Sequence, residues 1–215
     1  MYRKNLPVRT DAVNQVTPSL DMALSGPRMR TYLRATGNCR EKALALHRWN
    51  GQAGALFHYP IQLFELTLRN SVSAALSSRL GEDRWFTSDL LPQTSRDLIA
   101  KTQAEGAKTA PDTIARLSLG FWVALHHKRC AELWRRATHE AYTVKLSQKI
   151  VGSRLNELKK LRNRIAHHEP VLRYELAQLY SDLLDAVSWM NPAARDEIEA
   201  VSTPALMSHL AARPA

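Results

Sequence analysis

Apolar residues at helical spacing are the feature that most constrains the fold of this chain. In segments 53–80 and 147–168 they recur three or four positions apart, so each set lies along one face of a helix. The positions are Ile61, Phe64, Leu68, Val72, Ala75 and Leu76 in the first segment, and Ile150, Val151, Leu155, Leu158, Leu161 and Ile165 in the second. No segment shows the strong two-residue alternation that is typical of a strand. The sequence therefore predicts an all-α helical bundle.

Proline and glycine residues predict where further helices begin and end. Ser25-Gly26-Pro27 is expected to open a helix that reaches about residue 35, since proline suits the first helical turn. Asn50-Gly51 is expected to close a short helix over 40–49, and Pro60 to kink the long helix or mark its true start. Other helices are expected at 94–105, from Ala110-Pro111 to Leu125 with a break at Leu119-Gly120, and at 128–137, 171–190 and 191–210.

The chain shows neither an internal repeat nor a low-complexity tract, so it predicts one principal domain. Residues 1–24, interrupted by Pro7 and Pro18, are expected to form an N-terminal arm. Residues 25–190 are expected to form the helical domain, preceded by short helices. Residues 191–215 are expected to form a C-terminal helix or tail.

Charge and composition indicate the environment and the partner class. The 215-residue chain has a formal net charge of +10, which favours a polyanion, most often a nucleic acid, over the alternative of a basic protein without such a partner. Its longest stretch without a charged residue, from Trp49 to Phe64, is too short and polar to span a membrane. Cys39 and Cys130 lie outside any metal-ligand spacing and are expected to be free thiols in a reducing cytoplasm.

The segment 154–169, RLNELKKLRNRIAHHE, combines a packed helical face with residues suited to chemistry on phosphate. Histidine has the side-chain pKa closest to neutrality and suits proton transfer. The guanidinium of arginine can donate two parallel hydrogen bonds to phosphate oxygens, and asparagine can hold an imidazole in one orientation. His167 follows Asn163 by four positions and shares its helix face, whereas Arg162 lies five positions before His167. Either the helix distorts near His168, or the set closes between two copies of the chain.

These residues resemble the motif of the HEPN superfamily, an arginine, usually a polar residue, and a histidine four to six positions on. The longer string LRNRIAHHEP resembles the Abi-like (abortive infection) branch of that superfamily. Four further blocks resemble the same branch in the expected order, so that the resemblance covers about residues 20–190: SGPRMRTYL at 25–33, ALHRWN at 45–50, FELTLRN at 64–70 and LSLGFWVAL at 117–125.

The resemblance implies a HEPN-like helical bundle that forms a homodimer and, in many members, a metal-independent ribonuclease. It places the protein in the bacterial cytoplasm, in phage defence (abortive infection) or as a toxin, with RNA as substrate and an antitoxin or regulatory RNA or protein as a further partner. His167 would transfer protons, Arg162 would stabilise phosphate charge and Asn163 would orient His167, leaving a 2′,3′-cyclic phosphate. No metal or cofactor is expected. A catalytically silent RNA- or nucleotide-binding module, or a dimeric partner protein, is the alternative.

Other residues have a functional and a structural interpretation. His168 is either a second proton carrier or a helix-end residue, and Arg164 either binds phosphate or is a solvated charge. Glu65 and Arg69 are spaced for an ion pair along one helix, although their block also makes Arg69 and Asn70 candidates for supporting the site. His126-His127 is expected to be a surface pair, while Trp122 and Trp134 are expected to lie in the core.

Overall fold

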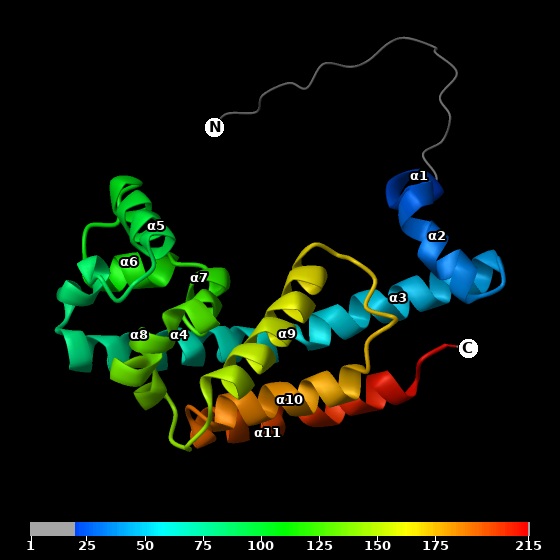
Figure 1. The fold of residues 1–215 in the computed structure, drawn as a ribbon. Helices are drawn as coiled ribbons and strands as arrows, with labels where there is room; N and C mark the ends of the chain where they lie inside the picture. Colours follow the sequence, from blue (N-terminus) through cyan, green and yellow to red (C-terminus); the bar gives the residue numbers. More distant parts are fainter. Residues whose placement is uncertain (1–19, 215) are drawn as a thin grey trace, which may run out of the picture.

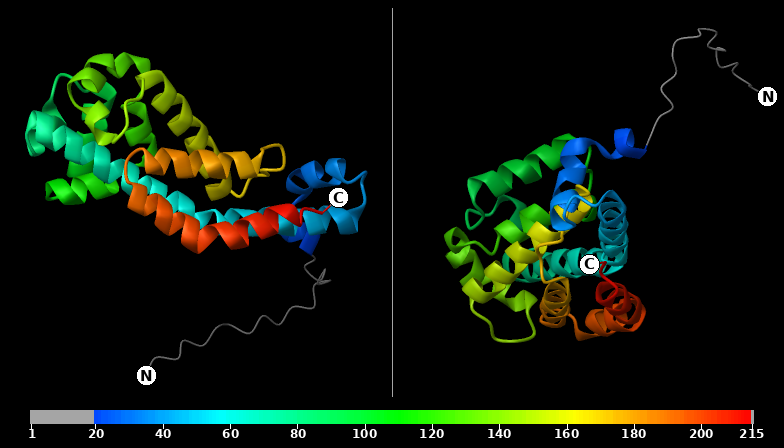
Figure 2. Two further views of the ribbon diagram at one scale, coloured as in Figure 1. Left: turned by 90° about the horizontal axis from the view of Figure 1, so that it is seen from below. Right: turned by 90° about the vertical axis from the view of Figure 1, so that its right-hand side faces the viewer.

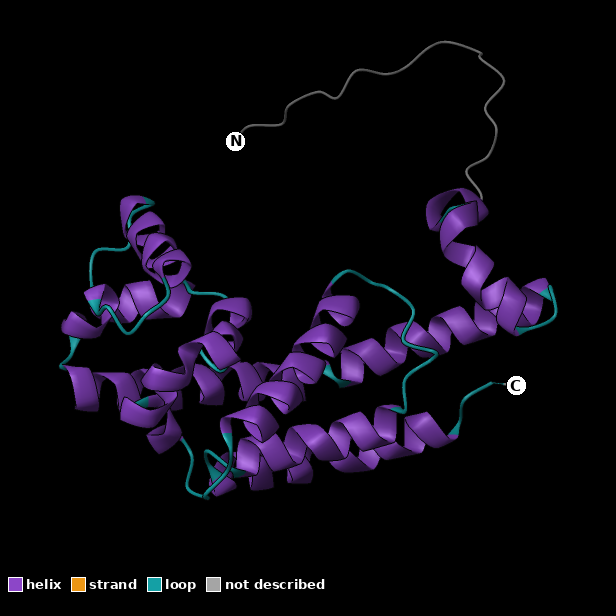
Figure 3. Ribbon diagram, in the orientation of Figure 1, coloured by secondary structure: helices purple, strands orange, loops and turns teal. Residues whose placement is uncertain are grey.

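The computed structural model describes residues 20–214, and every regular element in that range is helical, which confirms the all-α bundle (Figures 1 and 3). The elements are α1 Leu20–Leu24, α2 Gly26–Ala35, α3 Arg40–Leu56, α4 His58–Leu80, η1 Asp83–Thr87, α5 Gln93–Ala104, α6 Ala110–Arg116, α7 Leu119–Ala124, η2 Lys128–Cys130, α8 Ala131–Arg136, η3 Thr138–Ala141, α9 Gln148–Ala166, α10 Leu176–Ser188 and α11 Pro192–Ala211. Most of the expected N-terminal arm, residues 1–19, lies outside the described residues.

α3 and α4 follow one another across the length of the molecule, and the other helices pack around them (Figures 1 and 2). α10 and α11 lie side by side along this pair, and α11 contacts both α3 and α4. α9 crosses the bundle obliquely and packs against α7 and α10. The short helices α1 and α2 extend one end of the bundle, whereas η1, α5 and α6 extend the other. Apolar side chains from all the long helices fill the core, among them Phe64, Leu68, Leu155, Leu183, Ile198 and Leu206, each fully buried.

The expected helix end at Asn50-Gly51 is wrong, because α3 continues through both residues to Leu56. The Asn50 side chain is buried, and its Oδ1 accepts a hydrogen bond of 2.8 Å from the backbone N–H of Val171. This tertiary contact outweighs the low helix propensity of the Asn-Gly pair. The break falls instead at the buried Phe57, so Pro60 lies in the first turn of α4, where a missing N–H costs little.

Two other boundaries differ from those that proline and glycine predicted, and a side-chain cap sets the first of them. The Oγ of Ser118 accepts a hydrogen bond from the N–H of Phe121, so the break expected at Leu119-Gly120 falls two residues earlier and α7 begins at Leu119. α10 begins at Leu176, five residues after the predicted start at 171. The intervening loop lies directly after the motif-bearing helix α9 and carries part of the candidate site.

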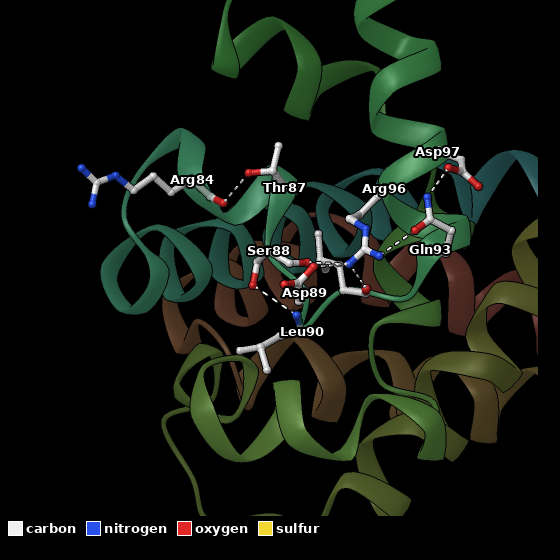
Figure 4. A network of polar contacts seen from close by, with 9 residues as sticks. Arg84, Thr87, Ser88, Asp89, Leu90, Gln93, Arg96 and Asp97 are labelled. Atoms are coloured by element: carbon white, nitrogen blue, oxygen red, sulfur yellow. Dashed lines mark hydrogen bonds and ion pairs between the residues drawn. The ribbon is translucent and has the colours of Figure 1, made fainter.

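The turn between η1 and α5 is closed by a single guanidinium group (Figure 4). Arg96 donates to the carbonyl oxygens of Ser88 and Leu91 at 3.2 and 3.1 Å, and to Oε1 of Gln93 at 2.6 Å. An ion pair of 3.3 Å with Asp89 adds to these bonds. Backbone carbonyls that the turn leaves without a helical partner are thereby satisfied.

His126 is not part of a surface pair, as the sequence suggested, but is buried with 2% of its surface exposed. Its Nδ1–H donates to the carbonyl of Trp122 at 3.0 Å, so its Nε2 is free to accept from the hydroxyl of Tyr142 at 2.7 Å. The carbonyl oxygen of His126 itself would lie 2.7 Å from a Cβ at Gly152, which places α9 in close backbone contact with this segment. The arrangement helps to fix the position of α9.

The buried imidazole predicts a stability that depends on pH. Burial lowers the pKa of His126 from 6.5 to about 4, so between these values the unfolded chain binds a proton that the folded chain does not. The free energy of unfolding should therefore fall by about 3 kcal/mol as pH drops from 6.5 to 4. Urea unfolding at a series of pH values measures this change. His126→Gln, which keeps an acceptor for Tyr142 but cannot titrate, should give a flatter profile, and parallel profiles for the two proteins would contradict the assignment.

Candidate functional site

Helix α9 holds the motif by burying one face and exposing the other. Ser147 caps its start by accepting a hydrogen bond from the N–H of Ile150 at 3.3 Å. The buried residues of the helix are Val151, Leu155, Leu158 and Leu161. Ile150, which the spacing predicted to join this stripe, is instead exposed, although the adjacent Val151 is fully buried. The next turn after Leu161 carries Arg162, Asn163 and Arg164, so their orientations follow from this stripe.

The last turn of α9 ends in a backbone motif that makes His168 the turning residue. The N–H of His168 donates to the carbonyl of Ile165 at 3.0 Å, and the N–H of Glu169 to that of Arg164 at 2.8 Å. This is the Schellman pattern, in which the residue after the cap takes a left-handed conformation, and His168 has φ 55°. The helix therefore stops at Ala166, two residues before the predicted end, and the side chains of both histidines are exposed.

Arg162 binds an acidic residue of α4. Its Nε donates to Oε1 of Glu65 at 2.6 Å, and both side chains are partly buried. The i, i+4 ion pair considered for Glu65 and Arg69 is therefore not formed, and Nη1 of Arg69 donates instead to the carbonyl of Ala115 at 3.1 Å. Three of the candidate residues thus gather on one side of α9.

The remaining candidates are not brought to Arg162 within one chain. Asn163 and His167 are exposed, and in the described part of the chain neither side chain has a hydrogen-bond partner. Only their backbones are linked, by a bond of 2.9 Å from the N–H of His167 to the carbonyl of Asn163. Asn70 is also exposed and lies outside this cluster.

Arg164 is held in an aromatic and ionic cluster that sequence reasoning did not identify. Its Nε donates to the hydroxyl of Tyr174 at 2.8 Å, its guanidinium lies 5.5 Å from the centre of that ring, and its Nη1 pairs with Glu169 at 3.0 Å. Arg173 also donates to the Tyr174 hydroxyl, at 3.2 Å, and this bond lowers the pKa of the phenol, with Arg164 acting in the same direction. The cluster fixes the loop that follows α9. A lone tyrosine in a predicted helix gave no signal for it.

Two cavities flank the last turn of α9. Cavity A, of about 440 Å³, lies on the α4 side and is lined by Glu65, Arg69, Trp122 and Arg162 among others. Cavity B, of about 1020 Å³, lies toward α2 and α3 and is lined by Arg28, His47, Gly54 and His168 among others. The two share three lining residues, His58, Ile165 and Ala166.

Comparison of the chain with models of known protein families, with curated proteins and with solved structures finds no match. Among the described residues, three or more histidine, cysteine or carboxylate side chains nowhere gather in a group that could hold a metal ion. Across residues 20–214, none of the helices combines the length and the apolar character needed to cross a membrane.

Proposed function

We propose that this protein is a metal-independent endoribonuclease of the HEPN type that acts in bacterial abortive infection or as a toxin. The resemblance of LRNRIAHHEP and its flanking blocks to Abi-like proteins motivates the proposal. The net charge of +10 supports a polyanionic substrate. A fold alone does not establish an activity, so the proposed activity depends on Arg162 and His167.

The observation that carries the proposal is the separation of these two residues within one chain. Arg162 is bound to Glu65 on one side of α9, while His167 is exposed at its end and has no side-chain partner among residues 20–214. A two-fold axis close to the end of α9 would set the exposed histidine of one copy near the arginine of the other. We therefore infer a homodimer with a site composed from both copies.

The chemistry of such a site needs proton transfer and charge stabilisation. The 2′-OH of the RNA attacks the adjacent phosphorus in line and loses its proton, the bond from phosphorus to the 5′-oxygen breaks, and that oxygen gains a proton. His167 transfers protons in this exchange, and Arg162 stabilises the negative charge that develops on the phosphate. Asn163 orients His167 or a phosphate oxygen. The products are a 2′,3′-cyclic phosphate and a 5′-hydroxyl end.

The ion pair between Arg162 and Glu65 favours one alternative, a catalytically silent module that binds RNA or a nucleotide. A carboxylate 2.6 Å from the guanidinium competes with phosphate for the same donors. In the ribonuclease, phosphate must displace this carboxylate or share the guanidinium with it. In the silent module the pair is structural.

The proposal predicts RNA cleavage in the presence of a chelator. Purified protein incubated with total RNA in EDTA should produce fragments with 2′,3′-cyclic phosphate ends, because the nucleophile belongs to the RNA itself. Fragment ends are identified by enzymatic removal of the cyclic phosphate before labelling. Intact RNA would support the silent module, and cleavage restored only by magnesium would contradict the metal-free chemistry.

A further inference from the structure

The last turn of α9 forms a wall between cavities A and B. Ile165 and Ala166 line both cavities, and so does His58 at the start of α4. His167 follows Ala166 directly and is exposed at the end of this wall. A dinucleotide laid across this wall would place one nucleoside in each cavity and its phosphate at the last turn of α9, which His167 follows.

Cavity A has the size and chemistry of a nucleobase pocket. Its volume of about 440 Å³ lies within the range of small-molecule sites, and Trp122 and several aliphatic side chains supply apolar wall. The indole N–H of Trp122 is buried and has no hydrogen-bond partner in the structure that residues 20–214 form. A buried donor without an acceptor is unfavourable, so a ligand with acceptor atoms would relieve it after a small shift of the ring.

The rim of cavity A adds groups that suit a nucleotide. Gln62 is exposed there and offers both a donor and an acceptor to a base edge. Arg69 uses one nitrogen on Ala115 and keeps its other donors, while Arg162 and Glu65 stand as an ion pair beside it. Two guanidinium groups and one carboxylate leave this rim net positive, as a phosphate requires.

Cavity B is larger and holds a second set of basic groups. Nη1 of Arg28 donates to the carbonyl of His168 at 2.9 Å, and His47 lies in the same wall. Among the described side chains that line it, Glu169 is the one carboxylate, and it is paired with Arg164 at 3.0 Å. The helix surface at Gly51 and Ala55 is exposed and presents little side-chain bulk to a flat ring, whereas the neighbouring Gly54 packs against Ile165.

We propose that cavities A and B bind the two nucleosides on either side of the cleaved phosphate, so that the protein takes an unpaired, splayed dinucleotide step of RNA across the end of α9. This inference rests on the proposed function and specifies its substrate. Stacked bases in a duplex cannot part around a helical wall, whereas the bases of a single-stranded loop or end can be splayed apart. Paired RNA should therefore be a poor ligand.

The test measures binding without cleavage. The probe is a dinucleotide whose first sugar lacks the 2′-OH, compared with nucleoside monophosphates by calorimetry. Wild-type protein should bind the dinucleotide about tenfold more tightly than either monophosphate, because a second base is buried. In NMR spectra the dinucleotide should shift both the indole N–H signal of Trp122, assigned with Trp122→Phe, and the amide signal of Gly54.

A matched pair of variants separates cavity binding from general effects. Ala55→Leu fills cavity B, whereas Ala74→Leu makes the same change at an exposed position of α4 that lines neither cavity. Ala55→Leu should lose the tenfold gain and Ala74→Leu should keep it. Equal affinity for dinucleotide and monophosphate, an unmoved Trp122 signal, or identical behaviour of the two variants would overturn the inference. RNA cleavage together with equal affinity for the dinucleotide and the monophosphates would overturn only this inference. Tight binding of the dinucleotide without RNA cleavage would overturn only the proposed ribonuclease activity.

Discussion

Replacement of His167 by alanine is expected to lower the rate of RNA cleavage by about 10²- to 10⁴-fold, the usual cost of losing a general acid or base. The side chain of His167 is exposed and lies outside the buried stripe of α9, so the variant should fold and unfold as the wild type does. Initial rates on a labelled RNA, with circular dichroism as a check on folding, measure the effect.

The neighbouring histidine provides the matched control. His168 has φ 55°, a conformation that glycine adopts without strain, so His168→Gly removes an imidazole without disturbing the end of α9. Because the His168 side chain lines cavity B but transfers no proton in the proposed mechanism, this variant should lose far less activity than His167→Ala. Equal losses in both variants would mean that cleavage depends on the shape of the helix end, and a fully active His167→Ala protein would contradict the proposed mechanism.

Replacement of Arg162 by alanine is expected to cost about 10²- to 10³-fold in cleavage rate, as for the loss of one donor that stabilises developing charge. Glu65 then loses its partner, but the pair is only partly buried, and water can solvate the free carboxylate. The protein should therefore remain folded. Cleavage rates of this variant, measured beside its unfolding transition, separate lost chemistry from lost stability.

Arg154 on the same helix is the control for that experiment. It pairs with Asp182 at 2.7 Å and lies on the side of α9 that contacts α10, away from both cavities. Arg154→Ala should lower the stability of the fold and leave the cleavage rate of the folded protein unchanged. If both arginine variants lose activity in proportion to their loss of stability, Arg162 has no role in the chemistry.

Local patterns in the sequence predicted the helices whose boundaries depend on nearby residues. α9 buries four of the six apolar positions predicted for it, and α11 begins at the predicted Asn191-Pro192, where Oδ1 of Asn191 accepts a hydrogen bond from the N–H of Ala194. The prediction failed at Asn50-Gly51, where the deciding contact is with Val171. A bond to a residue so distant in sequence leaves no local signal, so propensity alone ended α3 too early.

The candidate site was likewise predictable from the sequence only where it depends on local residues. The residue types of Arg162, Asn163 and His167 suggested the chemistry, and helix periodicity showed that the arginine and histidine do not share a face. The sequence could not predict that Arg162 pairs with Glu65, because Glu65 lies 97 residues away. Glu65 is also spaced to pair with Arg69 on its own helix. Which side chains meet across helices depends on tertiary packing.

The central claim, a site composed from two copies of the chain, is tested most directly by mixing two inactive variants. Arg162→Ala and His167→Ala proteins are combined in equal amounts, unfolded and refolded together, and assayed on RNA beside each variant alone. If Arg162 of one copy acts with His167 of the other, half of the dimers are mixed and each has one intact site, so activity should return to about a quarter of the wild-type value. Activity that stays at the level of the separate variants, in a sample shown to contain mixed dimers, would contradict the composite site.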